Sequence, residues 1–239
     1  MTAEKTRRRE SDMYGPIRDM LRDMGFAARG EVKGCDIAAL RGDELCVVET
    51  KLSANITLLY QAMERKSFSP LVFVAVPRPK SFRDKKFGAL KKILEKLELG
   101  LILVSLDSPA PTAEIAIWPE AGTARNKKKA AAVTKEITGR SADTPGGSAA
   151  APVNTAYRER CIQIACLISA KGEMNSRELR QLGCGKGTAG ILRANHYGWF
   201  SKDGDGPGAK RGITEACRKY LDENKHSPLV AHYSAAAGE

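Results

Sequence analysis

Two short runs of almost entirely apolar residues constrain the fold of this chain most. They are LVFVAVP at residues 71–77 and LILVSL at residues 101–106. A strand that is apolar on both faces is typical of the centre of a sheet that is covered on both sides. The segment between them, FGALKKILEKLELG, has apolar residues at helical spacing and lysines on the opposite face. This strand, helix, strand order predicts a sheet with helices packed on it.

Further elements extend this order in both directions. Residues 10–26 form an amphipathic helix whose first turn is irregular because of Pro16. A second helix follows a cap at Asn55, and its apolar stripe is expected to be buried. That stripe consists of Ile56, Leu59, Tyr60 and Met63. Strand-like runs occur at residues 28–34, 35–40, 45–52 and 114–118. The predicted order is αβββαβαββ, an α/β fold with a mixed sheet.

The composition changes to Lys, Arg, Ala, Gly, Ser and Pro between Pro119 and Tyr157, which predicts a domain boundary there. The front of this segment, NKKKAAAVTKEITGR, could form a basic helix. Three helices with a glycine-rich turn, GCGKG, and a hairpin then describe a winged helix-turn-helix. The predicted parts are a basic tail (1–9), the α/β domain (10–119), a basic segment and flexible linker (120–156), a winged-helix-like domain (157–224) and a C-terminal tail (225–239), whose end, HYSAAAGE, is expected to be disordered.

Residues 34–52 read GCDIAALRGDELCVVETKL, in which the charged residues Asp36, Glu49 and Lys51 are unexpected in core strands. If residues 35–40 and 45–52 form an antiparallel hairpin with Leu40 opposite Leu45, opposed residue numbers sum to 85. Asp36 then faces Glu49, and strand alternation puts Lys51 on the face of Glu49 while Thr50 points the other way. A slip of one residue would separate the two acids.

Two opposed carboxylates repel each other unless a cation lies between them. All-oxygen ligation suits Mg²⁺, or Mn²⁺ in its place, with Asp36 and Glu49 as metal ligands. Lys51 could polarise an attacking water or neutralise charge on a phosphate oxygen, as phosphodiester hydrolysis requires. A structural ion pair of Lys51 with Glu49 or with Asp36 is the alternative interpretation.

The net charge of +11, with basic residues bunched near the N-terminus and in residues 125–140, indicates a polyanion partner. A solubilising role of these charges stays open. The sequence contains neither a secretory signal nor a membrane span, so a cytoplasmic location is expected. The six cysteines show no metal-ligand spacing and are expected to be reduced and structural.

The winged helix-turn-helix would place its third helix in the major groove of DNA. The predicted nucleic-acid contacts are Lys186, Thr188, Arg193, Asn195 and His196 on that helix, and Lys202, Lys210 and Arg211 on the wing. Tyr197, Trp199 and Phe200 are interpreted as core at the base of the wing. Winged helices also dock proteins, which is the alternative role of this part.

The helix, the hairpin with Asp36 and Glu49-Thr50-Lys51, and the following helix with Gln61 resemble the PD-(D/E)XK nuclease superfamily. The stretch from Glu10 to Gly147 is similar to a bacterial family of uncharacterised proteins described as PD-(D/E)XK phosphodiesterases. The matching pieces are ESDMYGPIRDMLRDMGF, EVKGCDIAALRGDELCVVETKL, LLYQAMERKSFSPLVFVAVPRP and TARNKKKAAAVTKEITGRSADTPGG. Cys35 precedes Asp36 where the motif has proline.

The resemblance implies a restriction-endonuclease-like αβββαβ core. It assigns Asp36 and Glu49 to metal binding and Lys51 to catalysis. It also suggests that Glu10 reaches the same metal and that Gln61 contacts the site or the substrate. Alternatively, the charge of Glu10 stabilises the helix by interacting with its dipole. The alternative for Gln61 is that it faces solvent.

The predicted function is a Mg²⁺-dependent phosphodiesterase or nuclease that acts on nucleic acid, double-stranded DNA first, delivered by the winged helix. A catalytically silent DNA-binding or regulatory protein on a nuclease-like fold is the alternative, and an interaction module of a larger assembly is a third. The question of whether the protein forms a homodimer stays open, because many nucleases of this fold act as dimers.

Overall fold

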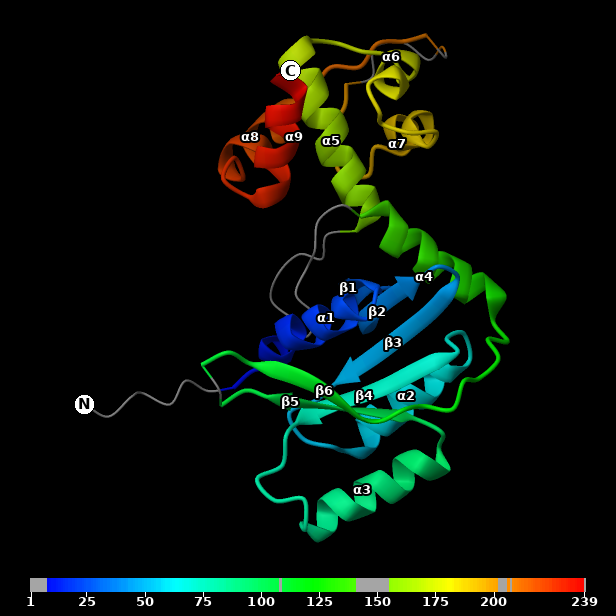
Figure 1. Ribbon diagram of the computed structural model, residues 1–239. Coiled ribbons are helices and arrows are strands. Elements are labelled where there is room, and N and C mark those ends of the chain that lie inside the picture. The colour runs from blue at the N-terminus through cyan, green and yellow to red at the C-terminus, as the bar shows by residue number, and fades with distance from the viewer. Residues whose placement is uncertain (1–7, 108, 141–154, 202–205, 207, 239) are drawn as a thin grey trace, which may run out of the picture. The chain divides into compact units, whose positions relative to one another are not determined.

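A computed structural model of the chain describes residues 8–107, 109–140, 155–201, 206 and 208–238 (Figure 1). The chain divides into two compact units, Met1–Val153 and Asn154–Glu239. The predicted Lys202 lies outside the described residues, as does the GGSAA stretch of the predicted linker. Among the described residues, no helix is long and apolar enough to cross a membrane.

The first unit contains the predicted order of helices and strands. Its elements are η1 (Glu10–Met13), α1 (Tyr14–Asp23), β1 (Ala27–Val32), β2 (Cys35–Arg41), β3 (Glu44–Thr50), α2 (Ile56–Lys66), β4 (Leu71–Pro77), α3 (Lys85–Lys96), β5 (Gly100–Ser105), β6 (Thr112–Ile117) and α4 (Lys127–Gly139). The 3-10 turn η1 precedes α1, which agrees with the irregular start expected from Pro16.

The six strands form one mixed sheet in the order β1-β2-β3-β4-β5-β6 (Figure 1). β4 lies in the middle and pairs parallel with β3 and β5, whereas the other neighbours are antiparallel. The apolar runs at residues 71–77 and 101–106 are therefore central strands or nearly so, as predicted. The mixed α/β sheet is confirmed.

The β2-β3 hairpin has the predicted register, because Leu40 pairs with Leu45 and Ile37 pairs with Val48. Continuing this register by one residue sets Asp36 opposite Glu49. Arg41 also pairs with Glu44, so the turn has two residues rather than the expected four. Gly42 in this turn has φ +58°, which glycine adopts without strain.

Helices cover both faces of the sheet, which explains why its central strands are apolar throughout. α1 packs on the face of Ile37, Val48 and Phe73. α2 and α3 pack on the opposite face, against Val72 and Val74. Further along that face, α4 packs with Val133 and Ile137 against the β1-β2-β3 end of the sheet. The hairpin that carries Asp36 and Glu49 thus lies between two apolar layers.

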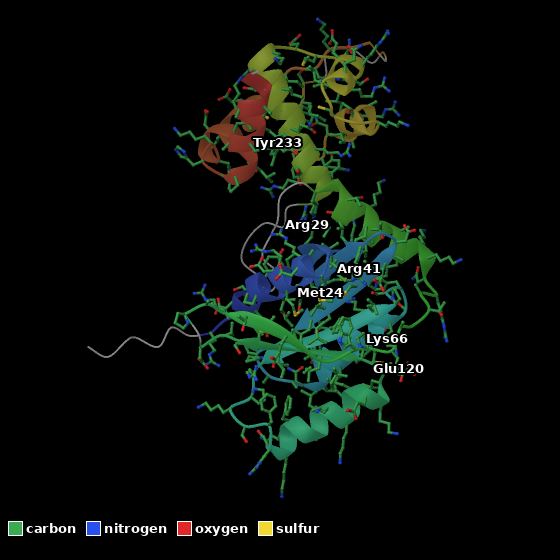
Figure 2. All side chains as sticks on the ribbon, viewed as in Figure 1. Met24, Arg29, Arg41, Lys66, Glu120 and Tyr233 are labelled. Carbon is green, nitrogen blue, oxygen red and sulfur yellow. The ribbon has the colours of Figure 1, made fainter. Side chains whose placement is uncertain are left out.

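The hairpin is also tied to the end of α1. The guanidinium of Arg41 lies over the ring of Phe26 at 4.4 Å, and its Nη1 donates to the carbonyl oxygen of Met24 at 3.1 Å. Figure 2 labels Arg41 and Met24. These contacts attach the tip of the hairpin to the residues that follow α1, so they help to fix the hairpin against the helix.

The predicted inward stripe of α2 is wrong for three of its four residues, whereas Leu59 is half-buried and packs against the core. Ile56, Tyr60 and Met63 are 80%, 65% and 42% exposed, and Leu58 and Ala62 are buried instead. Apolar residues surround much of this helix, so periodicity alone allows more than one inward face. The sheet selected the face with Leu58 and Ala62, which meets the valines of β4.

The segment NKKKAAAVTKEITGR forms α4, and it is part of the packed core of the first unit. Its end is fixed by Arg140, whose side chain donates to Glu136 at 2.9 Å and to the carbonyl oxygen of Gly30 at 2.9 Å. Arg140 is only 3% exposed. A buried guanidinium with several acceptors is well satisfied, so this segment serves as a structural helix.

The second unit is helical. Its elements are α5 (Ala156–Lys171), α6 (Ser176–Gln181), α7 (Thr188–Ala194), α8 (Glu215–Glu223) and α9 (Pro228–Gly238). Two antiparallel bridges, Met174 with Arg211 and Phe200 with Ile213, connect the segments between the helices. The predicted disorder of HYSAAAGE is wrong for residues 232–238, because they belong to α9, which buries Leu229 and Val230 and contacts α5.

Candidate active site

Asp36 lies at the start of β2, where the last residue of β3 holds its carboxylate. The backbone N–H of Thr50 donates to Asp36 Oδ2 at 2.8 Å, and the Thr50 hydroxyl donates to the same oxygen at 3.0 Å. Thr50 pairs with Ala75 and Glu49 pairs with Val74, on opposite faces of the sheet, so Thr50 points away from Glu49 as expected; its contact with Asp36 was not expected. Asp36 is half-buried.

Glu49 is the second acid of the hairpin, and it is fully buried at 0% exposure. Its Oε1 accepts a hydrogen bond from Arg65 Nε of α2 at 2.6 Å. Its Oε2 has no hydrogen-bond partner among the described residues. Sequence reasoning missed Arg65, and no local pattern could have found it, because 16 residues separate it from Glu49.

The pKa of the Glu49 carboxyl is raised to about 7, first by burial and second by the nearby charge of Asp36. Arg65, by its hydrogen bond and its charge, and Lys51, by its charge, oppose this rise. The effect of Asp36 on Glu49 is consistent with the two acids lying near each other. Glu49 is thus costly to ionise and has only one of its two carboxylate oxygens hydrogen-bonded. A further cation nearby would stabilise its charged form.

Lys51 follows the end of β3, and its backbone N–H donates to the carbonyl oxygen of Ala75 at 3.1 Å. Its Nζ donates to Glu10 Oε2 at 2.9 Å, and both side chains are about three-tenths exposed. The hydrogen bond to Glu10 raises the pKa of Lys51, and the charges of Glu10, Asp36 and Glu49 add to it. Lys51 is therefore an ammonium ion at neutral pH, so it can donate to an oxyanion but cannot act as a base.

Gln61 is half-buried on α2, four residues before Arg65. Residues four apart share one face of a helix, so Gln61 lies on the side of α2 from which Arg65 reaches Glu49. With the inward stripe corrected, Gln61 also neighbours the buried Leu58 and Ala62. Among the described residues, Gln61 forms no hydrogen bond with Asp36 or Glu49.

The donor set fits a hard divalent cation bound by two carboxylates. Mg²⁺ is commonly held by one or two protein carboxylates, with waters and substrate phosphates completing its shell. The unpaired, buried Glu49 Oε2 is the observation that favours a cation at this place. Among the described residues, no three or more His, Cys, Asp or Glu side chains form a group that could hold a metal. Glu10, which pairs with Lys51, thus does not complete a set of three ligands.

The predicted nucleic-acid contacts in the second unit fall into two groups. Lys186, Arg193, His196 and Lys210 are exposed, as a contact with a polyanion requires. Thr188 is 0% exposed and its hydroxyl donates to the carbonyl oxygens of Cys184 and Gly185, so its prediction as a contact is wrong. Asn195 and Arg211 are half-buried and bond the backbone of Phe200 and Ser201.

Two of the three aromatic residues after α7 lie in the core of this unit, as interpreted from the sequence, whereas Tyr197 is exposed. Trp199 and Phe200 are 6% and 2% exposed. Tyr197 is more exposed, at 38%, and stacks on Trp199 with ring centroids 4.8 Å apart. All six cysteines are buried and free, and burial raises the pKa of the Cys35 thiol to about 12, which makes these thiols structural.

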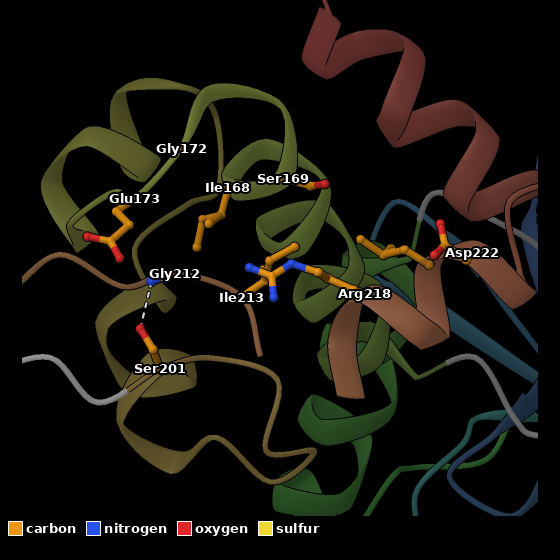
Figure 3. A pocket seen from close by; sticks show the side chains of 10 residues that line it. Ile168, Ser169, Gly172, Glu173, Ser201, Gly212, Ile213, Arg218 and Asp222 are labelled. Carbon is orange, nitrogen blue, oxygen red and sulfur yellow. Dashed lines mark hydrogen bonds between the residues drawn. The ribbon is translucent and has the colours of Figure 1, made fainter. Parts of the chain in front are cut away.

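A cavity of about 450 Å³ lies within the second unit, lined by α5, α8 and the segments joined by the bridges (Figure 3). Figure 3 shows the side chain of Arg218 extending into it and the hydrogen bond from Gly212 N–H to Ser201 Oγ, 2.8 Å long. Arg218 is already within 3.4 Å of Glu215. The cavity contains none of the predicted contacts, and nothing about its lining indicates a ligand.

A sequence model of the family described as "Putative PD-(D/E)XK phosphodiesterase" matches residues 102–208. This match confirms the family resemblance predicted from the sequence. The matched segment begins in β5 and extends into the second unit, and it does not include Asp36, Glu49, Lys51 or Arg65. The comparisons with curated proteins and with solved structures found no match.

Proposed function

From the resemblance of this chain to the PD-(D/E)XK phosphodiesterases, we propose that it is a Mg²⁺-dependent phosphodiesterase that hydrolyses nucleic acid. Double-stranded DNA is the first substrate to test. One observation carries the proposal. Glu49 is fully buried, lies one residue beyond the last register pair, Ile37 with Val48, on the side of Asp36, and has one carboxylate oxygen without a hydrogen-bond partner among the described residues. A structural ion pair would not require a second acid beside it.

Asp36 and Glu49 are the residues that would hold the metal, with Mn²⁺ as a substitute for Mg²⁺. A bound divalent cation supplies Lewis-acid polarisation of a phosphoryl oxygen and an activated water. Thr50 keeps one oxygen of Asp36 in place through two hydrogen bonds, so the other oxygen is available to a cation.

Lys51 would stabilise the negative charge that develops on the phosphate as the transition state forms. Its raised pKa keeps it charged, and Glu10 holds it in position through a hydrogen bond of 2.9 Å. In this proposal Glu10 orients Lys51 rather than binding the metal. Gln61, on the same side of α2 as Arg65, would contact the substrate.

The second unit supports a nucleic-acid substrate. Helices α5, α6 and α7, together with the two bridges that follow α5 and α7, are consistent with a winged-helix arrangement. The described residues do not form the complete hairpin of a wing. Its exposed cations, Lys186, Arg193 and Lys210, would bind phosphates.

The test is incubation of the purified full chain with plasmid, linear duplex, single-stranded DNA and RNA, at about 5 mM Mg²⁺ or Mn²⁺. Asp36→Ala and Lys51→Ala are the site variants, and Lys92→Ala, an exposed lysine of α3, is the matched control. We expect cleavage by the wild type and by the control, and a loss of at least about 100-fold in both site variants. Equal cleavage by all variants contradicts the site. DNA retention without cleavage selects the alternative, a silent DNA-binding protein.

A further inference from the structure

Arg65 connects the two strands that carry the acids. It lies in the last turn of α2, and its side chain is 13% exposed. Its Nε donates to Glu49 Oε1 at 2.6 Å, and its Nη2 donates to the carbonyl oxygen of Gly34 at 2.5 Å. Gly34 is two residues before Asp36. We propose that Arg65 is a positioning residue that orients Glu49 for the divalent cation, an inference that rests on the proposed function.

The hydrogen bonding of Glu49 shows why an orienting residue is needed. A glutamate side chain has three rotatable bonds, and a buried carboxylate can turn either oxygen toward a ligand. Arg65 occupies Oε1, which leaves Oε2 buried and without a partner among the described residues. A buried carboxylate oxygen without a partner is unfavourable, so it is expected to receive a cation or an ordered water.

The second contact of Arg65 extends this effect to Asp36. Gly34 has φ +81° in the turn between β1 and β2, and the strand with Asp36 begins directly after it. By holding the carbonyl of Gly34 and the carboxylate of Glu49 at once, the guanidinium couples the positions of the two acids. A planar guanidinium with donors on separate nitrogens suits this bridging, whereas a lysine carries its three donors on a single nitrogen and cannot reproduce the fork.

Arg65 could in principle act in the opposite sense, as a cation that competes with the metal for Glu49. The geometry favours positioning, because a metal that binds Oε2 does not need to displace Arg65 from Oε1. The charges agree with this view. Arg65 and Lys51 bring two positive charges to three carboxylates, Glu10, Asp36 and Glu49, so the group retains a negative charge that attracts a divalent cation.

The test measures the binding of Mn²⁺ to the full chain, by isothermal titration calorimetry and by electron paramagnetic resonance, without any substrate. The variants are Arg65→Ala and Arg65→Lys. The matched control is Lys66→Ala (Lys66 is labelled in Figure 2), which removes the next cation of the same turn, one that pairs with Glu98 instead. Thermal unfolding of each variant in EDTA is measured in parallel.

We expect Arg65→Ala to raise the dissociation constant for Mn²⁺ by about 10-fold or more, as loss of a residue that orients a metal ligand commonly does. Arg65→Lys should fall between the wild type and Arg65→Ala, and millimolar guanidinium should restore part of the affinity of Arg65→Ala. A residue with a merely structural role would lower the unfolding temperature without such a rescue. Lys66→Ala should bind as the wild type does.

Unchanged or tighter Mn²⁺ binding by folded Arg65→Ala overturns the inference, and tighter binding identifies Arg65 as a competitor. If Arg65→Ala does not fold, Arg65→Lys decides, because it keeps the charge and most of the packing; wild-type affinity in that variant rejects the bridging role. Failure of the proposed function looks different: the wild type would then bind no Mn²⁺, or Asp36→Ala would bind it equally well.

Discussion

The Thr50 hydroxyl donates to Asp36 Oδ2 at 3.0 Å, beside the hydrogen bond that the Thr50 backbone donates to the same oxygen. Thr50 is 2% exposed, so this oxygen is held by two donors within the protein. The strand end of β3 therefore fixes one acid through Thr50 and presents the other as Glu49. Hydrogen bonds to a charged carboxylate are among the stronger ones in proteins, which makes Thr50 a support for the candidate metal site.

Thr50→Val removes the hydroxyl but keeps the backbone donor and a β-branched shape suited to a strand. We expect the dissociation constant for Mn²⁺ to rise by roughly 3- to 10-fold, since the remaining donor fixes Asp36 less firmly. Titration calorimetry measures it. Thr112→Val on β6, an exposed strand position, is the control. Wild-type affinity in folded Thr50→Val would show that the hydroxyl does not support the site.

Glu10→Gln tests the pairing of Glu10 with Lys51. The hydrogen bond from Lys51 and the charge of Glu10 both raise the pKa of Lys51, so neutralising Glu10 should lower that pKa. Carbon-13 NMR of the lysine Cε measures it, with Lys51→Arg used to assign the signal. The affinity for Mn²⁺ should change little, because Glu10 is not expected to be a ligand. A large loss of Mn²⁺ affinity with an unchanged Lys51 pKa would instead make Glu10 a metal ligand.

Glu49 gives the stability of the metal-free protein a dependence on pH. Its pKa is about 7 in the folded state against 4.5 ordinarily, so between these values the folded state binds more protons than the unfolded state. Stability from this residue is therefore highest below the lower value and falls as the pH rises through 7. Above pH 7, the buried charge of Glu49 works against the fold.

Glu49→Gln should for this reason raise the free energy of unfolding in EDTA more at pH 8 than at pH 4.5, by roughly 1–3 kcal/mol. Chemical denaturation at both pH values measures the difference. Glu114→Gln is the control, since Glu114 is an exposed strand residue paired with Arg78. An equal effect of Glu49→Gln at both pH values would show that the buried carboxylate is not costly to ionise.

In the second unit, Arg193→Ala should weaken the binding of duplex DNA and lower the salt dependence of that binding by about one counterion. Arg193 is exposed on α7, so its removal should leave the fold intact. Lys219→Ala on α8 is the matched control, an exposed cation that lies 3.9 Å from Glu223. Fluorescence anisotropy over a salt series measures both. A salt dependence equal to that of the wild type would remove Arg193 from the interface.

The sequence alone determined the order of the strands and helices in the first unit and the register of the β2-β3 hairpin. Both depend on local patterns: alternation and continuous apolar runs define the strands, and the short turn between Leu40 and Leu45 fixes which residues face each other. The prediction that Asp36 lies opposite Glu49 extends this register by one residue beyond its last pair, Ile37 with Val48. No tertiary information was needed for it.

Only the tertiary structure decided which side chains complete the site. Arg65 reaches Glu49 from another helix, and Lys51 pairs with Glu10, which is 41 residues away. The inward face of α2 was likewise settled by packing, because apolar residues on several sides of that helix leave its periodicity ambiguous. Contacts between distant segments depend on how helices dock on the sheet, and no local pattern encodes that docking. The hairpin thus presents the two acids, and the docked helices supply Arg65 and Glu10 around them.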